Sequence, residues 1–220
     1  MKLLITTPIL PPEIGGPATY VRGLATRITD LGHDARIITL TDSRPDKIGN
    51  IDITAIKRAT NKPTRQLSLL LNIMKKAKGC DLIYTQNPTS IGLASVLAGK
   101  ILRKPVVVRY GGDPAWEKAF REGKTDRSLE DFLKDPNASG DIIRVQNYVF
   151  KNAKKLIVPS EHHSNLLQEF YGVPKDKIAV IPNPIPTLLG VATSKEGGGK
   201  DIITVGRLIR LKGIQDIISS

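Results

Sequence analysis

The sequence has 220 residues, 40% of them hydrophobic, which is enough apolar material for a substantial globular core. Lysine and arginine number 33 against 21 acidic residues, and the net charge of +12 favours phosphate-bearing ligands, anionic membrane surfaces or nucleic acid. Aromatic residues make up only 5%, which argues against nucleic acid because stacking platforms are lacking. Cys80 is the single cysteine, so an intrachain disulfide is excluded and a cytoplasmic location is expected.

Apolar runs of strand length alternate with stretches of helical period, which is the pattern of βαβ units in a parallel sheet. Strands are predicted at 3–6, 36–40, 51–56, 82–85, 106–109, 156–158 and 178–181. Apolar residues recur with helical spacing from Val21 to Leu31, and Gly32 is placed to end this first helix. Further helices are predicted at 64–77, 91–102, 141–152 and 160–171, the last capped by Ser160. The sequence therefore predicts an α/β fold: a Rossmann-like parallel sheet with helices on both faces.

Two stretches depart from this repeat. Residues 116–140 are polar and broken by glycine and proline, so we interpret them as an insertion. Residues 189–200 are rich in glycine and predict a linker that ends a first domain of residues 1–188. Residues 201–220 contain one strand pattern and one helical turn, too little to bury a core, so we expect the start of a truncated second domain.

Polar and glycine-rich residues follow several of the predicted strands. In open parallel sheets the carboxyl ends of the strands share one edge, and ligands bind outside that edge. Glu13, Gly15 and Gly16 follow the first strand, Gln86 and Asn87 the fourth, Asp113 the fifth, Ser160 the sixth and Asn183 the seventh. The sequence therefore predicts a ligand site at this edge.

The Gly15-Gly16 pair predicts an anion site. Two glycines let a ligand approach the main chain, Pro17 suits the first turn of a helix, and the free N–H groups of Ala18 and Thr19 would face an anion. The alternative interpretation is a tight strand-to-helix turn.

Arg207 and Lys212 lie five positions apart, after the strand pattern at 202–205. The guanidinium would bind a diphosphate as a fork and the ammonium as a point charge. Two such cations would stabilise the charge that develops on a departing pyrophosphate. The alternative is a pair of solvated surface charges.

Several segments together resemble one known family. They are Pro-Pro-Glu-Ile-Gly-Gly at 11–16, Gly-His at 32–33, Val-Pro-Ser-Glu at 158–161, Ile-Pro-Asn at 181–183, and Val-Gly-Arg-Leu-x-x-x-Lys-Gly at 205–213. Their order and spacing resemble the retaining glycosyltransferases of family four, whose GT-B architecture places two Rossmann-like domains across a cleft. The resemblance implies that the chain is the N-terminal half of a GT-B fold and the start of the second domain.

The resemblance also implies an activity. Residues 1–188 would bind the acceptor, and residues from 201 onward would hold a nucleoside-diphosphate sugar whose sugar is transferred with retention and without a metal or other cofactor. Arg207 and Lys212 match the pair that binds the donor diphosphate, and the Gly16 amide would face the donor phosphates. The donor-binding candidates are Gly15, Gly16, Arg207 and Lys212, the catalytic candidates are Asp113, Arg207 and Lys212, and the acceptor-side candidates are Glu13, Asn87 and Ser160.

Asp113 lies in Gly-Asp-Pro-Ala-Trp-Glu, which resembles a branch of the family. Its carboxylate would orient the acceptor hydroxyl or the donor sugar. An aspartate that stabilises a loop turn is an equally good interpretation. The 220-residue form is expected to lack transferase activity alone.

The expected partners are a nucleotide sugar and a carbohydrate or lipid-linked acceptor. In the predicted helix at 64–77, Arg65, Asn72 and Lys76 would share one stripe, and Leu67, Leu70, Leu71 and Met74 the opposite one. Two interpretations of the basic stripe stay open: a solvated face, or peripheral contact with an anionic membrane at its inner face. The alternative functions are a nucleotide-sugar epimerase of similar architecture, which would need a general base, and a non-catalytic anion-binding module.

Overall fold

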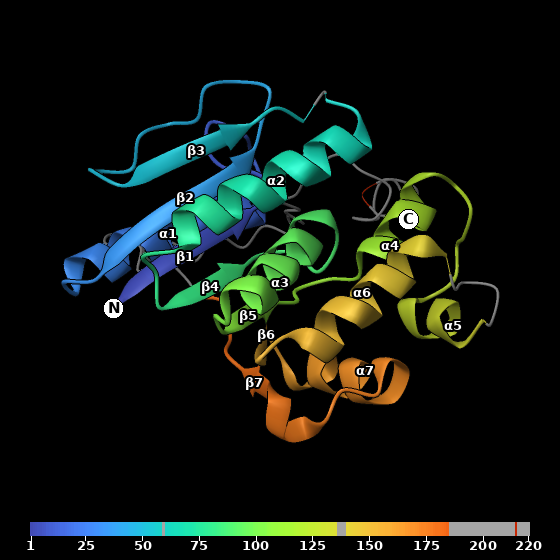
Figure 1. Cartoon of the computed structure of the whole chain (residues 1–220). Coiled ribbons are helices and arrows are strands. Elements are labelled where there is room, and N and C mark those ends of the chain that lie inside the picture. Colours follow the sequence, from blue (N-terminus) through green and yellow to red (C-terminus); the bar gives the residue numbers. More distant parts are fainter. Residues whose placement is uncertain (59, 136–139, 185–213, 215–220) are drawn as a thin grey trace, which may run out of the picture.

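The structure is a computed structural model that describes residues 1–58, 60–135, 140–184 and 214 (Figure 1). Within these residues seven parallel strands form one sheet in the order β3-β2-β1-β4-β5-β6-β7. The strands are β1 (Lys2–Thr7), β2 (Asp34–Leu40), β3 (Asp52–Ile56), β4 (Leu82–Thr85), β5 (Val106–Arg109), β6 (Lys155–Val158) and β7 (Ile178–Val180). The helices are α1 (Gly16–Asp30), α2 (Lys62–Ala77), α3 (Ser90–Leu102), α4 (Pro114–Arg121), α5 (Leu129–Lys134), α6 (Asp141–Asn152) and α7 (Glu161–Tyr171).

The predicted α/β fold class is confirmed. Each predicted strand is present, with bounds that differ from the prediction by at most two residues. The strand order reverses direction at β1 and β4, which is the doubly wound arrangement of Rossmann-like sheets. The predicted linker at 189–200 and the second-domain start at 201–220, apart from residue 214, lie outside the described residues.

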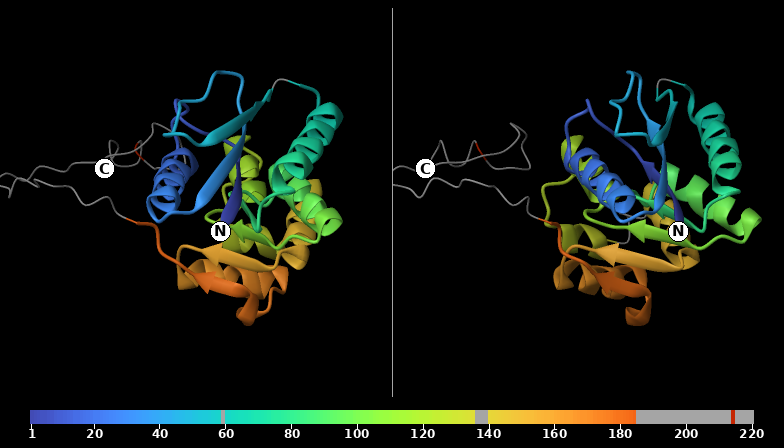
Figure 2. Two further views of the ribbon diagram at one scale, coloured as in Figure 1. Left: turned by 60° about the vertical axis from the view of Figure 1, so that its left-hand side comes forward. Right: turned by 90° about the vertical axis from the view of Figure 1, so that its left-hand side faces the viewer.

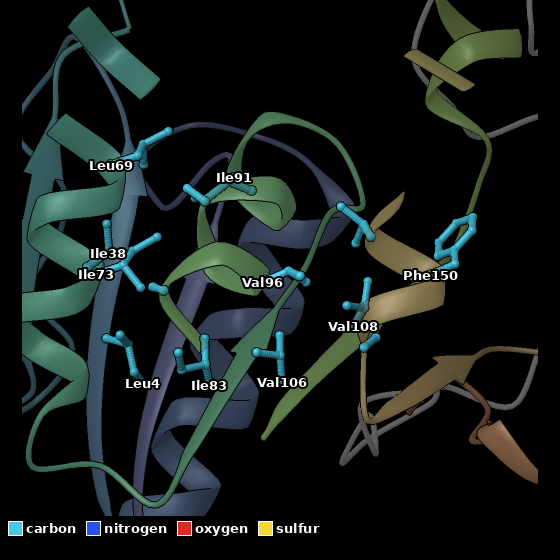
Figure 3. Close-up of a cluster of buried hydrophobic side chains, with 14 of the residues drawn as sticks. Leu4, Ile38, Leu69, Ile73, Ile83, Ile91, Val96, Val106, Val108 and Phe150 are labelled. Carbon is cyan, nitrogen blue, oxygen red and sulfur yellow. The ribbon is translucent and has the colours of Figure 1, made fainter. Parts of the chain in front are cut away.

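Apolar side chains pack on both faces of the sheet. Successive residues of a strand point to opposite faces, so Leu4 and Ile5 of β1 enter different clusters. Ile5 packs with Val21 and Ala25 of α1. Leu4 belongs to the larger cluster beneath α2, α3, α6 and α7, part of which Figure 3 shows. In Figure 2, α1 lies on one side of the sheet and α2 and α3 lie on the other.

Helix α1 begins and ends where the sequence indicates. Gly15 is its N-cap and Pro17 lies in its first turn. Gly32 has a left-handed φ of 75°, and its N–H donates to the carbonyl of Thr29 at 2.9 Å. The predicted end of the first helix at Gly32 is therefore confirmed.

The stretch interpreted as an insertion contains two short helices, α4 and α5. Asp113 caps α4 by accepting from the N–H groups of Ala115 and Trp116. Ser128 caps α5 by accepting from the N–H of Asp131. The end of β5 and the start of α4 thus lie side by side at the carboxyl edge of the sheet.

The predicted apolar stripe of α2 is confirmed only in part, since Leu70 and Met74 pack against the core and Leu67 and Leu71 do not. The buried face carries Leu69, Ile73 and Ala77, whereas Leu67 and Leu71 are 57% and 56% exposed. The residues expected to form a basic stripe are engaged locally: Arg65 Nη1 donates to the Arg58 carbonyl at 2.7 Å, and Lys76 pairs with Asp52 at 2.5 Å. The exposed face of α2 is therefore apolar at Leu67 and Leu71 and basic at Lys75 and Lys78.

Candidate functional site

The loops at the carboxyl edge of the sheet surround a cavity of about 940 Å³. Its walls come from the first turns of α1, the loops after β4, β5 and β7, and the start of α4. Residues that line it include Gly16, Tyr20, Arg27, Gln86, Asn87, Arg109, Gly111, Gly112, Glu117, Asn183 and Pro184. A cavity therefore lies at the edge where the sequence predicts a ligand site. Four segments that are distant in the sequence form its walls.

Arg109, the last residue of β5, is the most unusual group in the lining. Its side chain is nearly buried, since the residue is 9% exposed. Nη2 donates a hydrogen bond to Oδ1 of Asn183, and the guanidinium carbon lies 4.2 Å from the centre of the Tyr20 ring. A cation stacked on an aromatic face is held in one orientation. A fixed positive charge therefore lies at the inner wall of the cavity.

Gln86, which follows β4, also lines the cavity and contacts Tyr84 of that strand. Gln86 Nε2 lies 3.3 Å from the hydroxyl of Tyr84 and donates to it. Burial raises the pKa of the Tyr84 phenol above its usual value, with a further contribution from Tyr20, so Tyr84 stays neutral. Among the described residues, Gln86 Oε1 is buried without a hydrogen-bond donor.

The first turn of α1 places Gly16 at the cavity. A Cβ added to Gly16 would meet no atom within 4 Å, so the fold itself does not demand glycine here. A Cβ on Gly15 would come 2.7 Å from Cδ1 of Ile9. One expectation for this turn is wrong: the Thr19 N–H is not free, because it donates to the Gly15 carbonyl at 3.1 Å.

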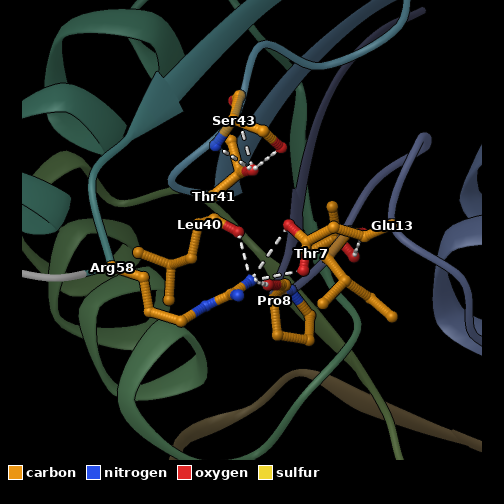
Figure 4. A network of polar contacts seen from close by, with 8 residues as sticks. Thr7, Pro8, Glu13, Leu40, Thr41, Ser43 and Arg58 are labelled. Carbon is orange, nitrogen blue, oxygen red and sulfur yellow. Dashed lines mark hydrogen bonds and ion pairs between the residues drawn. The ribbon is translucent and has the colours of Figure 1, made fainter.

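Glu13, an acceptor-side candidate, belongs to a polar network that fixes this loop (Figure 4). Arg58 Nη2 lies 2.9 Å from Glu13 Oε2, and the same nitrogen donates to the carbonyls of Pro8 and Leu40 at 2.9 and 2.7 Å. Glu13 is not among the residues that line the cavity. The network ties the loop between β1 and α1 to the ends of β2 and β3.

Asp113, a catalytic candidate, is buried beneath the cavity and does not line it. Its Oδ1 accepts from the N–H groups of Ala115 and Trp116 at 2.9 and 3.1 Å. Its Oδ2 accepts from the Tyr110 hydroxyl at 3.1 Å, from Gln146 Nε2 at 3.0 Å and from the Tyr171 hydroxyl. Five donors and 1% exposure favour the alternative interpretation, a turn-stabilising carboxylate.

Ser160 caps α7 as predicted: its Oγ accepts from the His163 N–H and lies 2.8 Å from Nδ1 of the same residue. It is not among the lining residues either. Asn87, the remaining acceptor-side candidate, does line the cavity. Arg207 and Lys212 lie outside the described residues.

Sequence reasoning missed Arg109 and Tyr20, whereas Gln86 was named with Asn87 in the loop after the fourth predicted strand. Arg109 was assigned to the strand at 106–109, yet a charged residue that closes a run of three valines at the ligand edge is itself a signal. Gln86 follows β4 directly, next to the predicted Asn87. Tyr20 gave no signal, because an aromatic residue in a helix is most often part of the core.

The class of protein follows from comparison with known families. The profile of Glycosyltransferase Family 4 matches residues 14–187, which is more than half of the chain, and the protein belongs to this family. The matched region contains the whole cavity lining.

One curated relative is the alpha-monoglucosyldiacylglycerol synthase of Streptococcus pneumoniae (strain ATCC BAA-255 / R6). It is 28% identical over 117 residues, which cover 50% of this chain and 26% of the relative. The chain therefore spans about a quarter of the length of that relative.

Solved structures share the fold. A glycosyltransferase from Rickettsia africae ESF-5 matches with a TM-score of 0.53 and 20% identity, over 84% of this chain and 43% of that one. The UDP-GlcNAc 2-epimerase of Neisseria meningitidis, solved with UDP-GlcNAc bound, matches with a TM-score of 0.54 and 15% identity, over 82% and 45%. Both matches span less than half of the solved chains, and the shared region is the Rossmann-like sheet of GT-B proteins.

Proposed function

We propose that the chain takes part in moving a sugar from a nucleoside-diphosphate sugar to an acceptor, with retention at the anomeric carbon. The observation that carries this proposal is the cavity at the carboxyl edge of the sheet, where Gly16 opens the start of α1 to a ligand. Family membership supports sugar transfer as the reaction. Retention is inferred from the resemblance alone.

In this proposal the donor diphosphate lies between two sets of positive groups. The main chain at Gly16 contributes one, since the first N–H groups of a helix have no partner within the helix. Arg207 and Lys212 contribute the other and take the place of a metal ion in neutralising the leaving group. Residues 1–188 form the acceptor-binding domain, 189–200 the linker and 201–220 the start of the donor-binding domain.

The acceptor is proposed to be a carbohydrate or a lipid-linked molecule. The name of the Streptococcus pneumoniae relative refers to a diacylglycerol lipid, which supports the lipid-linked option. The net charge of +12 and the exposed Leu67, Leu71, Lys75 and Lys78 of α2 support peripheral contact with an anionic membrane. None of the described helices combines the length and the apolar character of a membrane span.

Calorimetric titration with UDP, GDP and ADP tests the donor site. We expect one nucleotide to bind, with an affinity that falls at least roughly tenfold in Arg207→Ala and in Gly16→Ala. Arg22→Ala is the matched control, because Arg22 is an exposed cation of α1 that does not line the cavity. Equal affinity in all variants would contradict the proposed site.

The epimerase alternative predicts a different product. UDP-GlcNAc 2-epimerases share the fold at TM-scores of 0.51 to 0.54. An epimerase would change the sugar while it stays on the nucleotide, whereas a transferase releases free nucleoside diphosphate only when an acceptor is present. Nuclear magnetic resonance of a nucleotide sugar, incubated with acceptor and with a form of the protein that includes a complete second domain, separates these outcomes, and the anomeric coupling of a transferred sugar reports retention.

A further inference from the structure

The guanidinium of Arg109 is a buried cation whose hydrogen-bond partner is neutral. The residue is 9% exposed, and Nη2 donates to the amide oxygen of Asn183. Arg109 belongs to none of the ion pairs formed among the described residues. Buried arginines are nearly always paired with an anion, because an uncompensated charge away from water is costly.

The remaining donors of Arg109 are available to a ligand. Within the described part of the chain, Nη2 is the guanidinium nitrogen that has an acceptor. Gly111 keeps the space beside the guanidinium open, since a Cβ there would lie 2.9 Å from Nη1. Tyr20 supports the guanidinium from one side, at 4.2 Å from its ring centre. A planar group held in this way can donate two parallel hydrogen bonds to one oxyanion.

Gln86 supplies a second unmet polar group in the same wall. The residue is only 7% exposed, and among the described residues no donor reaches its Oε1. If the Gln86 amide were rotated so that its oxygen and nitrogen exchange places, one of the two atoms would still lack a partner, because the Tyr84 hydroxyl can satisfy only one of them. An unmet amide beside an unpaired cation fits a ligand that carries both hydroxyl and acidic groups.

We propose that Arg109, with Gln86 and Asn183, forms a subsite for an oxyanion, a phosphate or a carboxylate, carried by the acceptor. The assignment to the acceptor rests on the proposed function, in which Gly16, Arg207 and Lys212 hold the donor diphosphate. Arg109 ends β5, and Gln86 and Asn183 follow β4 and β7, so all three belong to residues 1–188, the part proposed to bind the acceptor. The acceptor class is therefore a hydroxylated molecule with an acidic group close to the sugar-accepting oxygen.

The test is a titration of the ¹⁵N-labelled 220-residue chain with inorganic phosphate, followed by nuclear magnetic resonance, with and without UDP. We expect phosphate to shift the Arg109 side-chain Nε–H signal and the Gly111 and Gly112 amides. Arg109→Gln should weaken this binding at least tenfold, and Arg22→Gln should leave it unchanged, because Arg22 is an exposed arginine of α1 that does not line the cavity. Gly111→Ala is the second variant, because it displaces the guanidinium while it keeps the charge, and it should also weaken phosphate binding.

Three results would overturn the proposal. Phosphate shifts that are spread over surface lysines, or are equal in Arg109→Gln and the parent chain, would remove the subsite. Loss of the Arg109 phosphate shifts when UDP is added would assign the oxyanion to the donor. A different result separates the subsite from the proposed donor site: a chain that binds phosphate at Arg109 but does not bind UDP would contradict the donor site and support the subsite.

Discussion

Asp113 illustrates at the residue scale how one carboxylate joins three elements. It caps α4 and accepts hydrogen bonds from Tyr110 after β5, Gln146 of α6 and Tyr171 of α7. The pKa values of both tyrosine phenols are raised, chiefly by burial and then by the Asp113 charge. These phenols therefore remain protonated donors at neutral pH.

We predict that Asp113→Asn destabilises the fold. The amide NH₂ would replace one carboxylate oxygen. Because NH₂ is a donor and cannot accept hydrogen bonds, it would face other donors, at a cost of about 2–4 kcal/mol in the free energy of unfolding. Urea denaturation followed by circular dichroism measures this loss. Unchanged stability together with abolished sugar transfer would restore the catalytic role.

His163 gives a pH-dependent prediction. Its pKa is lowered by burial first and then by the charges of His162 and Arg109. Because the folded-state pKa lies below the unfolded value of about 6.5, the unfolded chain takes up the proton first as the pH falls. The contribution of neutral His163 to the free energy of unfolding is therefore complete above about pH 6.5 and declines as the pH falls below that value.

The measurement compares the parent chain with His163→Asn in urea denaturation between pH 8 and pH 5. We expect the parent chain to lose more stability than the variant as the pH falls below about 6.5. Parallel pH profiles for the two proteins would contradict this prediction.

At the scale of elements, α3 approaches its neighbours through glycines. A Cβ on Gly92 would lie 2.3 Å from the backbone oxygen of Asn87, in the loop that lines the cavity. Gly23 of α1 offers a contrast, since a Cβ there would meet nothing within 4 Å. The same substitution should therefore have opposite effects in the two helices.

We predict that Gly92→Ala lowers the free energy of unfolding by about 1–3 kcal/mol, because backbone must move. Gly23→Ala should raise it by about 0.5–1 kcal/mol, because alanine loses less entropy in a helix. Thermal and urea denaturation of both variants check the pair. Stabilisation by Gly92→Ala would show that the approach of α3 to this loop is looser than described.

The order of elements was predictable because each signal is local. Strand runs such as 106–109 and helix ends such as Gly32 are written in a few adjacent residues. The faces of α2 were predictable only in part, because Leu67 and Leu71 continue the apolar stripe of Leu70 and Met74 in the sequence, yet they are exposed. Which of these residues are buried depends on where the sheet lies, which the local sequence does not specify.

The same limit applies to the site. Gly16 and Asn87 were predicted at the cavity because loops after parallel strands share one edge. The contact between Arg109 and Asn183 joins residues 74 positions apart, so no local pattern reveals it. Asp113 and Glu13 were recognised as polar loop residues. Their hydrogen-bond and ion-pair partners come from other elements and hold them away from the cavity surface, which the local sequence does not reveal.

At the scale of the whole molecule, the positive charge and the exposed face of α2 predict membrane binding. We expect the chain to sediment with vesicles that contain anionic lipid and to be released by salt, because ionic strength screens the attraction.

Leu67→Ser with Leu71→Ser, and separately Lys75→Glu with Lys78→Glu, should reduce the bound fraction several-fold. Lys124→Glu is the control, since Lys124 is exposed in the segment between α4 and α5. Equal sedimentation of every variant, or equal binding to neutral vesicles, would contradict a role for this face of α2.

A crystal structure of the chain with the nucleotide that binds in titration tests the central claim most directly. The account predicts a diphosphate in the cavity at the carboxyl edge, against the main chain at Gly16, with Gly16→Ala weakening binding about tenfold, or 1.4 kcal/mol, without loss of stability. A nucleotide bound at another surface, or full affinity in Gly16→Ala, would contradict it.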